Sequence, residues 1–142
     1  ILLCLSAEAL GIMEVLNRLT VEYSKSRKQF GAPIGSFQAL QHRMVDNFMA
    51  FEQSKSMVYR GICESTSFNK NDIDINQFLK TAHAVKALIA KNSKQIGDES
   101  IQIHGGIGMT DELNIGHFVK RLMMINVLFG DGDFHRQCFS QN

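Results

Sequence analysis

The sequence has 142 residues, 44% of them hydrophobic and 20% charged, with a formal net charge of +1. This length suffices for one domain with its own core, and the balanced charge excludes the strongly basic surface typical of nucleic-acid binding. The cysteines Cys4, Cys63 and Cys138 are widely separated. We therefore expect neither a disulfide framework nor a zinc finger, and a reducing compartment is favoured. The apolar runs are too short for a membrane span.

The first half of the chain predicts two long helices. Apolar residues recur at helical spacing from the start to about Arg27, and Gly31 and Pro33 end this helix. Ser36 is expected to cap a second helix that ends near Thr66. Its predicted apolar face, which could be core or subunit interface, carries Phe37, Leu40, Met44, Phe48 and Phe51.

The second half predicts a polar loop, two more helices and a short tail. The loop covers residues 67–72, and the third helix that follows it ends at Gly105-Gly106. Thr110 is expected to cap the fourth helix, and a helical tail runs from Asp133 to Gln141. No stretch alternates for long enough to predict a strand. The expected fold is all-α, an antiparallel four-helix bundle that spans residues 1–142.

Metal binding is the first chemistry to consider for a helix bundle. No glutamate has a histidine three residues later, and the histidines lack the H-E-x-x-H spacing. Asp131, Asp133 and His135 resemble a ligand cluster only loosely, because aspartates near a helix start are usually solvated. We expect no metal site.

The turn after the first helix combines a cation, an amide, an aromatic ring and a glycine. These residues are Arg27, Gln29, Phe30 and Gly31. An arginine beside backbone N–H groups suits a phosphate, and a phenylalanine offers its face to a flat ring. Taken singly, Arg27 is more often a solvated cation at a helix end and Phe30 more often a core residue. Together with the second polar turn, described next, this turn suggests a flat, phosphorylated ligand.

A second turn with polar neighbours follows the third helix. Gln102 and His104 precede Gly105-Gly106-Ile107-Gly108. The run lacks the preceding strand and the third glycine of the Rossmann fingerprint. A tight turn between helices explains the glycines by itself, but clustered glycines also allow a ligand to approach the backbone.

Both turns resemble segments of the acyl-CoA dehydrogenase family. The run Arg27–Ile34 with Phe37-Gln38 resembles the family's R-x-x-F-G…Q segment, and Gln102–Met109 resembles its Q-x-x-G-G-x-G segment. Ala9–Ile12 and Arg121 fit as well, so the resemblance covers essentially the whole chain. It identifies the chain as the C-terminal four-helix domain, and it implies that the family's N-terminal helical and central β domains are absent here.

The resemblance implies a role in FAD binding, largely to the cofactor held by a neighbouring subunit. Family members form dimers or tetramers. A carboxylate base removes the α-proton of an acyl-CoA and the β-hydride passes to the flavin, which gives a trans-2-enoyl-CoA. The residues that match the family's FAD-binding positions are Arg27, Gln29, Phe30, Gln38, Gln102, Gly105 and Gly106.

The family's catalytic base has no clear counterpart in this sequence. Many members carry it in a Tyr-Glu-Gly-Thr stretch, which aligns with Phe129-Gly130-Asp131-Gly132, so the glutamate position falls on Gly130. Other members carry it at a position that falls at or before Ile1. Three explanations remain. Asp131 acts as the base after a one-residue shift, the base lies upstream, or the protein is the base-less subunit of a heteromeric enzyme such as those that degrade steroid side chains.

The main interpretation is the C-terminal domain of an FAD-dependent acyl-CoA dehydrogenase, inactive as an isolated chain. The alternative is a non-catalytic assembly and flavin-binding subunit of a heteromeric enzyme. The expected partners are an acyl-CoA substrate, further subunits in a homo- or hetero-oligomer, and an electron-transfer acceptor, with neither nucleic acid nor a membrane span. We expect the bacterial cytoplasm, with the mitochondrial matrix as the alternative compartment.

Overall fold

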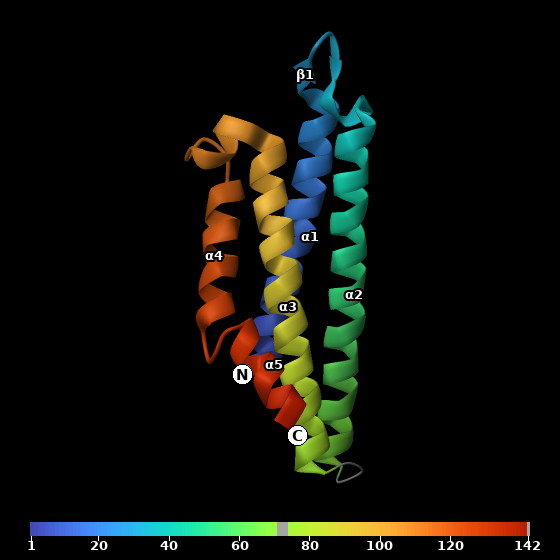
Figure 1. The fold of residues 1–142 in the computed structure, drawn as a ribbon, viewed down its shortest axis with the longest axis vertical. Helices are drawn as coiled ribbons and strands as arrows, with labels where there is room; N and C mark the ends of the chain where they lie inside the picture. The colour runs from blue at the N-terminus through green and yellow to red at the C-terminus, as the bar shows by residue number, and fades with distance from the viewer. Residues whose placement is uncertain (71–73, 142) are drawn as a thin grey trace.

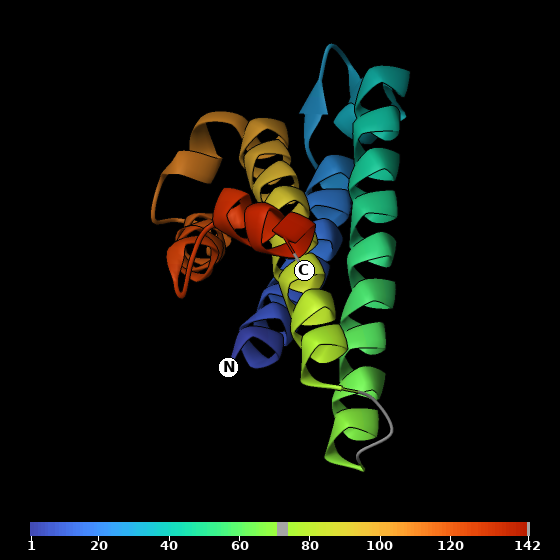
Figure 2. The ribbon, with the colours of Figure 1, turned by 60° about the horizontal axis from the view of Figure 1, so that its bottom comes forward.

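The computed structural model describes residues 1–70 and 74–141, and it is an all-α bundle as predicted. Figure 1 shows α1, α2 and α3 as long neighbours, with α2 antiparallel to the other two, α4 beside α3, and the short α5 packed on α3. Figure 2 shows α5 crossing α3 at a steep angle. The elements in chain order are α1 (Leu2–Ser26), β1 (Lys28–Gln29), β2 (Ala32–Pro33), the 3₁₀ helix η1 (Ile34–Ser36), α2 (Gln38–Asn69), α3 (Ile75–His104), the 3₁₀ helix η2 (Gly105–Met109), α4 (Ile115–Val127) and α5 (Gly132–Gln141).

Helix α3 is the centre of the bundle, because it contacts all four other α-helices. Its start is capped by Asp74, whose Oδ1 accepts a hydrogen bond from the Gln77 N–H at 2.7 Å. Burying each large aliphatic side chain in the core contributes about 1.5–3 kcal/mol to folding. The buried core consists of Ala9, Met13, Leu16, Ala50, Phe51, Val58, Val85, Ile89, Ile96, Ile115, Val119, Leu122 and Ile125.

The predicted first and third helices and the helical tail are confirmed to within one or two residues. The predicted cap at Ser36 is wrong. Ser36 belongs to η1 and its hydroxyl donates to the Pro33 carbonyl at 2.7 Å, while α2 begins at Gln38 without a side-chain cap. The buried Ile34 draws this segment onto the bundle, so the chain makes a 3₁₀ turn before the helix.

Two further boundaries differ from the prediction. Helix α2 continues through Asn69, three residues beyond the expected end, so residues 67–69 of the predicted loop at 67–72 are helical and Lys70 is a turn. Residues 71 and 72 lie outside the described residues. Helix α4 begins at Ile115, not at Thr110. The Thr110 hydroxyl donates to the Ile107 carbonyl at 2.9 Å and so closes the end of η2.

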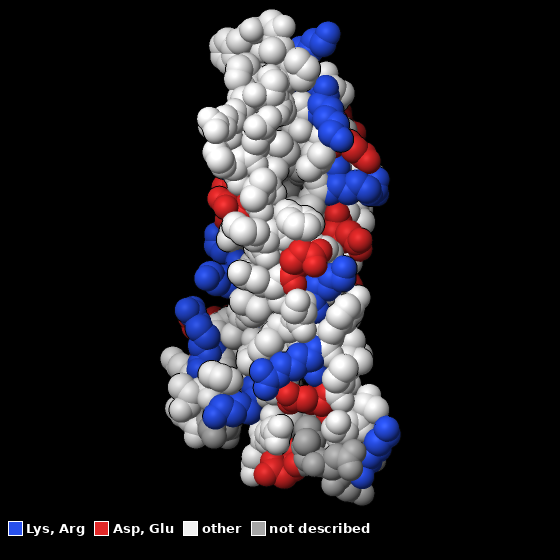
Figure 3. Space-filling view, turned by 90° about the vertical axis from the view of Figure 1, so that its right-hand side faces the viewer, with Lys and Arg blue, Asp and Glu red and all other residues white. Residues whose placement is uncertain are grey.

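The outer face of α2 is more apolar than its packing requires. Of the predicted apolar face, Phe51 is buried, but Phe48 is 58% exposed and Phe37 is exposed as well. The face that packs inward instead contains small and polar residues such as Asn47 and Ser54. Figure 3 shows that much of the upper part of this side of the molecule carries no Lys, Arg, Asp or Glu side chain.

Within the described residues, no helix is both long and apolar enough to cross a membrane. The same part of the chain holds no group of three or more His, Cys, Asp or Glu side chains placed to hold a metal ion.

Candidate functional site

The first predicted turn is a two-residue β-hairpin, which the sequence did not predict. Strands β1 and β2 pair antiparallel, with Gln29 opposite Ala32. The turn residues Phe30 and Gly31 both have positive φ, 52° and 81°, as a hairpin turn of the primed type requires. Positive φ is unusual for a bulky residue and costs about 1–2 kcal/mol, yet the Phe30 side chain is 92% exposed. The hairpin therefore holds an aromatic ring out in solvent.

The hairpin is anchored to the ends of α1 and α2. The Ile34 N–H donates to the Arg27 carbonyl at 2.8 Å, and the Gln41 Nε2 donates to the Gly35 carbonyl at 2.9 Å. A Cβ at Gly35 would lie 2.9 Å from the Ser24 Oγ, so only glycine allows η1 to approach α1 this closely. These contacts fix the position from which the exposed Arg27 projects.

The second predicted turn follows α3 directly. Gly105 ends the helix with φ 66°, and η2 continues from it. A Cβ at Gly105 or Gly106 would have no neighbour within 4 Å, so both glycines face open space. Gln102, one turn before, is exposed. The backbone here is therefore open to a ligand, as the clustered glycines suggested.

Tyr23 and His104 join the two turns. Their rings stack with centroids 4.3 Å apart, and the Tyr23 hydroxyl donates to the His104 carbonyl at 3.3 Å. His104 is 5% exposed, and burial lowers its pKa although a hydrogen bond to the Ser100 carbonyl acts in the opposite direction. The neutral ring thus serves as a packing partner. A hollow of about 540 Å³ lies between the end of α1 and the connection from η2 to α4, and both rings line it.

The structure places all seven predicted flavin-site residues at one end of the bundle. Arg27, Gln29, Phe30 and Gln38 lie on the hairpin and at the start of α2, and Gln102, Gly105 and Gly106 lie at the end of α3. Figure 1 shows these segments together at the top of the molecule. Segments about 70 residues apart in the sequence thereby lie at the same end of the bundle, because α1 and α3 run in the same direction.

Asp131 lies away from this surface, beyond the opposite end of α4. It belongs to the base-position loop, our name for residues 129–132, which connects α4 to α5. The Asp131 Oδ1 accepts a hydrogen bond from the Phe134 N–H at 2.8 Å, the geometry of a helix N-cap. Thirteen residues of α4 separate the loop from the η2 region, which is about 20 Å at 1.5 Å per residue.

The base-position loop has backbone geometry that disfavours any side chain at Gly130. Phe129 and Gly130 have φ of 59° and 105°. A Cβ at Gly130 would lie 2.5 Å from the Phe134 Cδ1 and 3.1 Å from the His135 Nε2. In this conformation, the loop has no room for a glutamate at the position where the family resemblance puts it.

The sequence analysis missed two buried polar contacts on α3. His83 meets His135 of α5, and Lys86 donates a hydrogen bond from Nζ to the Ile125 carbonyl near the end of α4. The signal was present, because His83 and Lys86 are the polar residues of the otherwise apolar stretch 82–90 and lie three positions apart.

The chain matches the family model "Acyl-CoA dehydrogenase, C-terminal domain" over residues 3–142. The acyl-CoA dehydrogenase IpdE2 of Mycolicibacterium smegmatis is 40% identical over 119 residues, which are 84% of this chain and 34% of the relative. The butyryl-CoA dehydrogenase structure from Megasphaera elsdenii superposes with a TM-score of 0.88 at 25% identity, covering 99% of this chain and 35% of that one. The FAD complex of PigA superposes with a TM-score of 0.85 at 29% identity, covering 97% of this chain and 34% of that one. The chain thus spans about a third of the length of these proteins.

Proposed function

Because the chain belongs to the acyl-CoA dehydrogenase family and corresponds to its C-terminal domain, we propose that it completes the flavin site and the subunit interface of an FAD-dependent acyl-CoA dehydrogenase. The observation that carries this proposal is that both turns lie at one end of the bundle, with Arg27 and Phe30 exposed on the first and the glycines of the second facing open space. The full-length protein would act on an acyl-CoA and pass electrons to an acceptor protein.

The residues at this surface suit a flavin dinucleotide. No carboxylate among the described residues pairs with Arg27, so its guanidinium is available for a phosphate. Phe30 offers an exposed ring to a flat heterocycle, and Gly105 and Gly106 leave room for close approach. Gln29, Gln38 and Gln102 supply exposed amides that donate and accept hydrogen bonds. When bound, FAD supplies the hydride acceptor of the dehydrogenation.

An exposed strained aromatic is also the kind of group expected at a contact between subunits. Backbone strain of this kind persists where it serves a function, and a ring that is 92% exposed gains no burial within its own chain. We infer that Phe30 is covered in the assembled protein, by a neighbouring subunit together with its cofactor. We propose the bacterial cytoplasm as the compartment, because a bacterial protein is among the relatives.

A second candidate function is a non-catalytic subunit of a heteromeric enzyme. The geometry at Gly130 favours it, because the loop excludes a glutamate and the one nearby carboxylate, Asp131, already caps α5. Such a subunit would contribute flavin contacts while its partner supplies the base. A base upstream of Ile1 remains the alternative source within the same polypeptide.

Anaerobic bleaching of the flavin in the full-length protein tests these proposals. The protein is mixed with a panel of acyl-CoA thioesters, alone and together with any co-encoded homologue. Bleaching by the protein alone indicates a base within its own chain, and bleaching only with the homologue indicates the non-catalytic role. Failure of the purified protein and of the pair to retain FAD contradicts both candidates.

The variant Asp131→Asn sharpens this experiment. Asparagine caps a helix as well as aspartate does, so the variant keeps α5 in place but removes the carboxylate. We expect unchanged bleaching, because Asp131 is a structural cap in this structure. A loss of bleaching of 100-fold or more, as removal of a general base causes, would identify Asp131 as the base instead.

A further inference from the structure

A histidine pair, in which His135 is buried and His83 half-buried, lies directly behind the base-position loop. The Nδ1 atoms of His83 on α3 and His135 on α5 are 2.8 Å apart, and the ring centroids are 5.0 Å apart. His135 is 1% exposed, and its Nε2 lies 3.1 Å from the Phe129 carbonyl oxygen. His135 therefore connects α3 to the first residue of the loop through both of its ring nitrogens.

The protons of an uncharged pair follow from these partners. A carbonyl oxygen only accepts, so the His135 Nε2 carries a hydrogen and donates it to Phe129. The His135 Nδ1 is then an acceptor, and His83 donates to it from Nδ1. One added proton is tolerated on the outer nitrogen of His83, because the hydrogen bond between the rings stays intact. A second proton is not tolerated, since both Nδ1 atoms would carry hydrogens 2.8 Å apart.

The charged groups around the pair oppose the second proton. Burial lowers the pKa of His135, and the nearby His83 and Lys86 lower it further, whereas the Phe129 carbonyl and Asp131 act in the opposite direction. Lys86, on the same face of α3, is completely buried. These groups act on His135 from α3 and from the loop.

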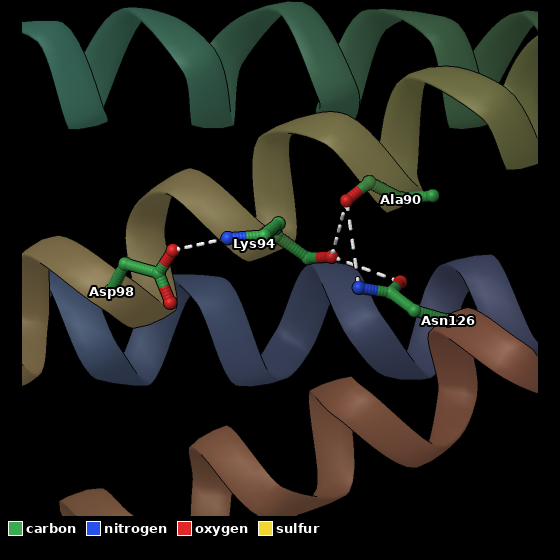
Figure 4. A network of polar contacts seen from close by, with 5 residues as sticks. Ala90, Lys94, Asp98 and Asn126 are labelled. Atoms are coloured by element: carbon green, nitrogen blue, oxygen red, sulfur yellow. Dashed lines mark hydrogen bonds and ion pairs between the residues drawn. The ribbon is translucent and has the colours of Figure 1, made fainter. Parts of the chain in front are cut away.

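The α4 side of the loop is held by contacts that do not involve histidine. Lys86 donates to the Ile125 carbonyl. Ser93 donates to the Asn126 Oδ1 at 3.1 Å, and the Asn126 Nδ2 donates to the Ala90 carbonyl at 3.4 Å (Figure 4). The loop is therefore fixed at its α4 end by Lys86 and Asn126, and at Phe129 and α5 by the histidine pair.

We propose that His135 is a positioning residue for the base-position loop, and that the His83–His135 pair releases the loop and α5 from α3 when both imidazoles become protonated. The strained φ of Phe129 and Gly130 makes this anchor necessary, because the loop relaxes once the hydrogen bond between the two histidines, which ties it to α3, is lost. Only the identification of this loop with the position of the catalytic base rests on the proposed function. The rest of the proposal, that the His83–His135 pair acts as a latch holding the loop and α5 on α3, depends only on the contacts described above.

Hydrogen exchange measured by mass spectrometry on the full-length, FAD-loaded protein between pH 5 and 8 tests the latch. Rates are corrected for intrinsic exchange, and peptides covering residues 128–139 are compared with peptides from α1. We expect the 128–139 peptides to be protected above pH 7. Below about pH 6.5 their protection should fall, by at most about tenfold per pH unit if one extra proton is taken up on opening.

Two variants separate a latch from a general structural role. In His83→Gln, the amide can donate to a neutral His135 or accept from a charged one, and it carries no charge. We expect this variant to keep the protection at pH 7.5 and to lose its decline in acid. His135→Ala should lower protection of the 128–139 peptides at every pH, and His117→Gln, an exposed histidine on α4, should behave as the wild type.

The proposal is overturned if wild-type protection does not change with pH, if His83→Gln shows the same decline in acid, or if His135→Ala leaves the protection at pH 7.5 unaltered. None of these readouts uses substrate. Flavin content and flavin bleaching, measured on the same preparations, report separately on the proposed dehydrogenase function.

Discussion

Among the described residues, the non-glycine residues with positive φ are Phe30 and Phe129, and a glycine follows each of them. Phe30-Gly31 has φ of 52° and 81°, and Phe129-Gly130 has φ of 59° and 105°. In each pair the phenylalanine ring is mostly exposed, 92% for Phe30 and 59% for Phe129. Each pair reverses the chain at a place where the family resemblance expects a ligand or a catalytic group. The strain is therefore concentrated at the positions where the family resemblance expects function.

Gly130→Ala should destabilise the protein. The alanine would require a backbone with φ of 105°, and its Cβ would lie 2.5 Å from the Phe134 ring. We expect the free energy of unfolding to fall by about 1–3 kcal/mol, measured by urea unfolding of the full-length protein. Gly11→Ala is the matched control, because a Cβ there has no neighbour within 4 Å and the residue is within a helix; it should be neutral or stabilising by up to about 1 kcal/mol. An equal change in the free energy of unfolding for both variants would contradict the conclusion that the backbone and the Phe134 ring require glycine at position 130.

Lys86 should make the free energy of unfolding depend on pH in the alkaline range. It is completely buried, and burial lowers its pKa, so the unfolded chain binds this proton more tightly than the folded chain. The contribution of Lys86 to stability therefore increases as the pH rises toward about 10.4. Relative to Lys86→Met, we expect the wild type to gain up to about 1.4 kcal/mol per pH unit in that window, measured by urea unfolding.

The exposed Lys91 provides the control for this measurement. The stability difference between the wild type and Lys91→Met should stay constant between pH 7 and 10. A constant difference for Lys86→Met as well would mean that its ammonium group is solvated in the folded protein.

Helix α2 presents two different faces. The inner face packs Phe51 and Val58 against the core, and the outer face exposes Val45, Phe48 and Met49 along the helix, each at 50% or more. A periodic run of apolar residues predicts a helix, but it does not identify which residues meet the core and which meet a second subunit. We infer that the outer face is covered in the oligomer.

Phe48 and Phe51 should therefore respond differently to substitution. Phe51→Ala removes a ring that is 8% exposed and should lower the free energy of unfolding by about 3 kcal/mol. Phe48→Glu should leave the fold intact and reduce the assembled mass measured by light scattering after gel filtration. If Phe48→Glu keeps the wild-type mass, the outer face of α2 is not a subunit interface.

At the scale of the whole molecule, the antiparallel arrangement decides which residues meet. The two flavin-motif turns share one end of the bundle, and the Tyr23–His104 stack holds them together. The base-position loop lies beyond the other end of α4. One domain can therefore contribute to two separate sites, one through its turns and one through this loop.

Arg27→Ala combined with Gln102→Ala should reduce FAD binding by the full-length protein. Each variant removes a polar group from a different turn of the same surface, so we expect the affinity to fall at least about tenfold. The flavin absorbance that remains after gel filtration measures this loss. Arg60→Ala is the control, because Arg60 pairs with Glu64 along α2 at 2.8 Å, away from the two turns. Full retention of flavin by the double variant would contradict a role of Arg27 and Gln102 in FAD binding.

The sequence by itself determined the helices, the bundle and the family, because helical periodicity, glycine breaks and the two turn motifs are local features. It also predicted that the residues around Arg27 and Gln102 act together. The tertiary structure decided what depends on long-range packing: the hairpin that holds Phe30 out in solvent, the inner face of α2, and the capping role of Asp131. The histidine pair belongs to this group as well, since His83 and His135 lie 52 positions apart and meet only because α5 packs on α3.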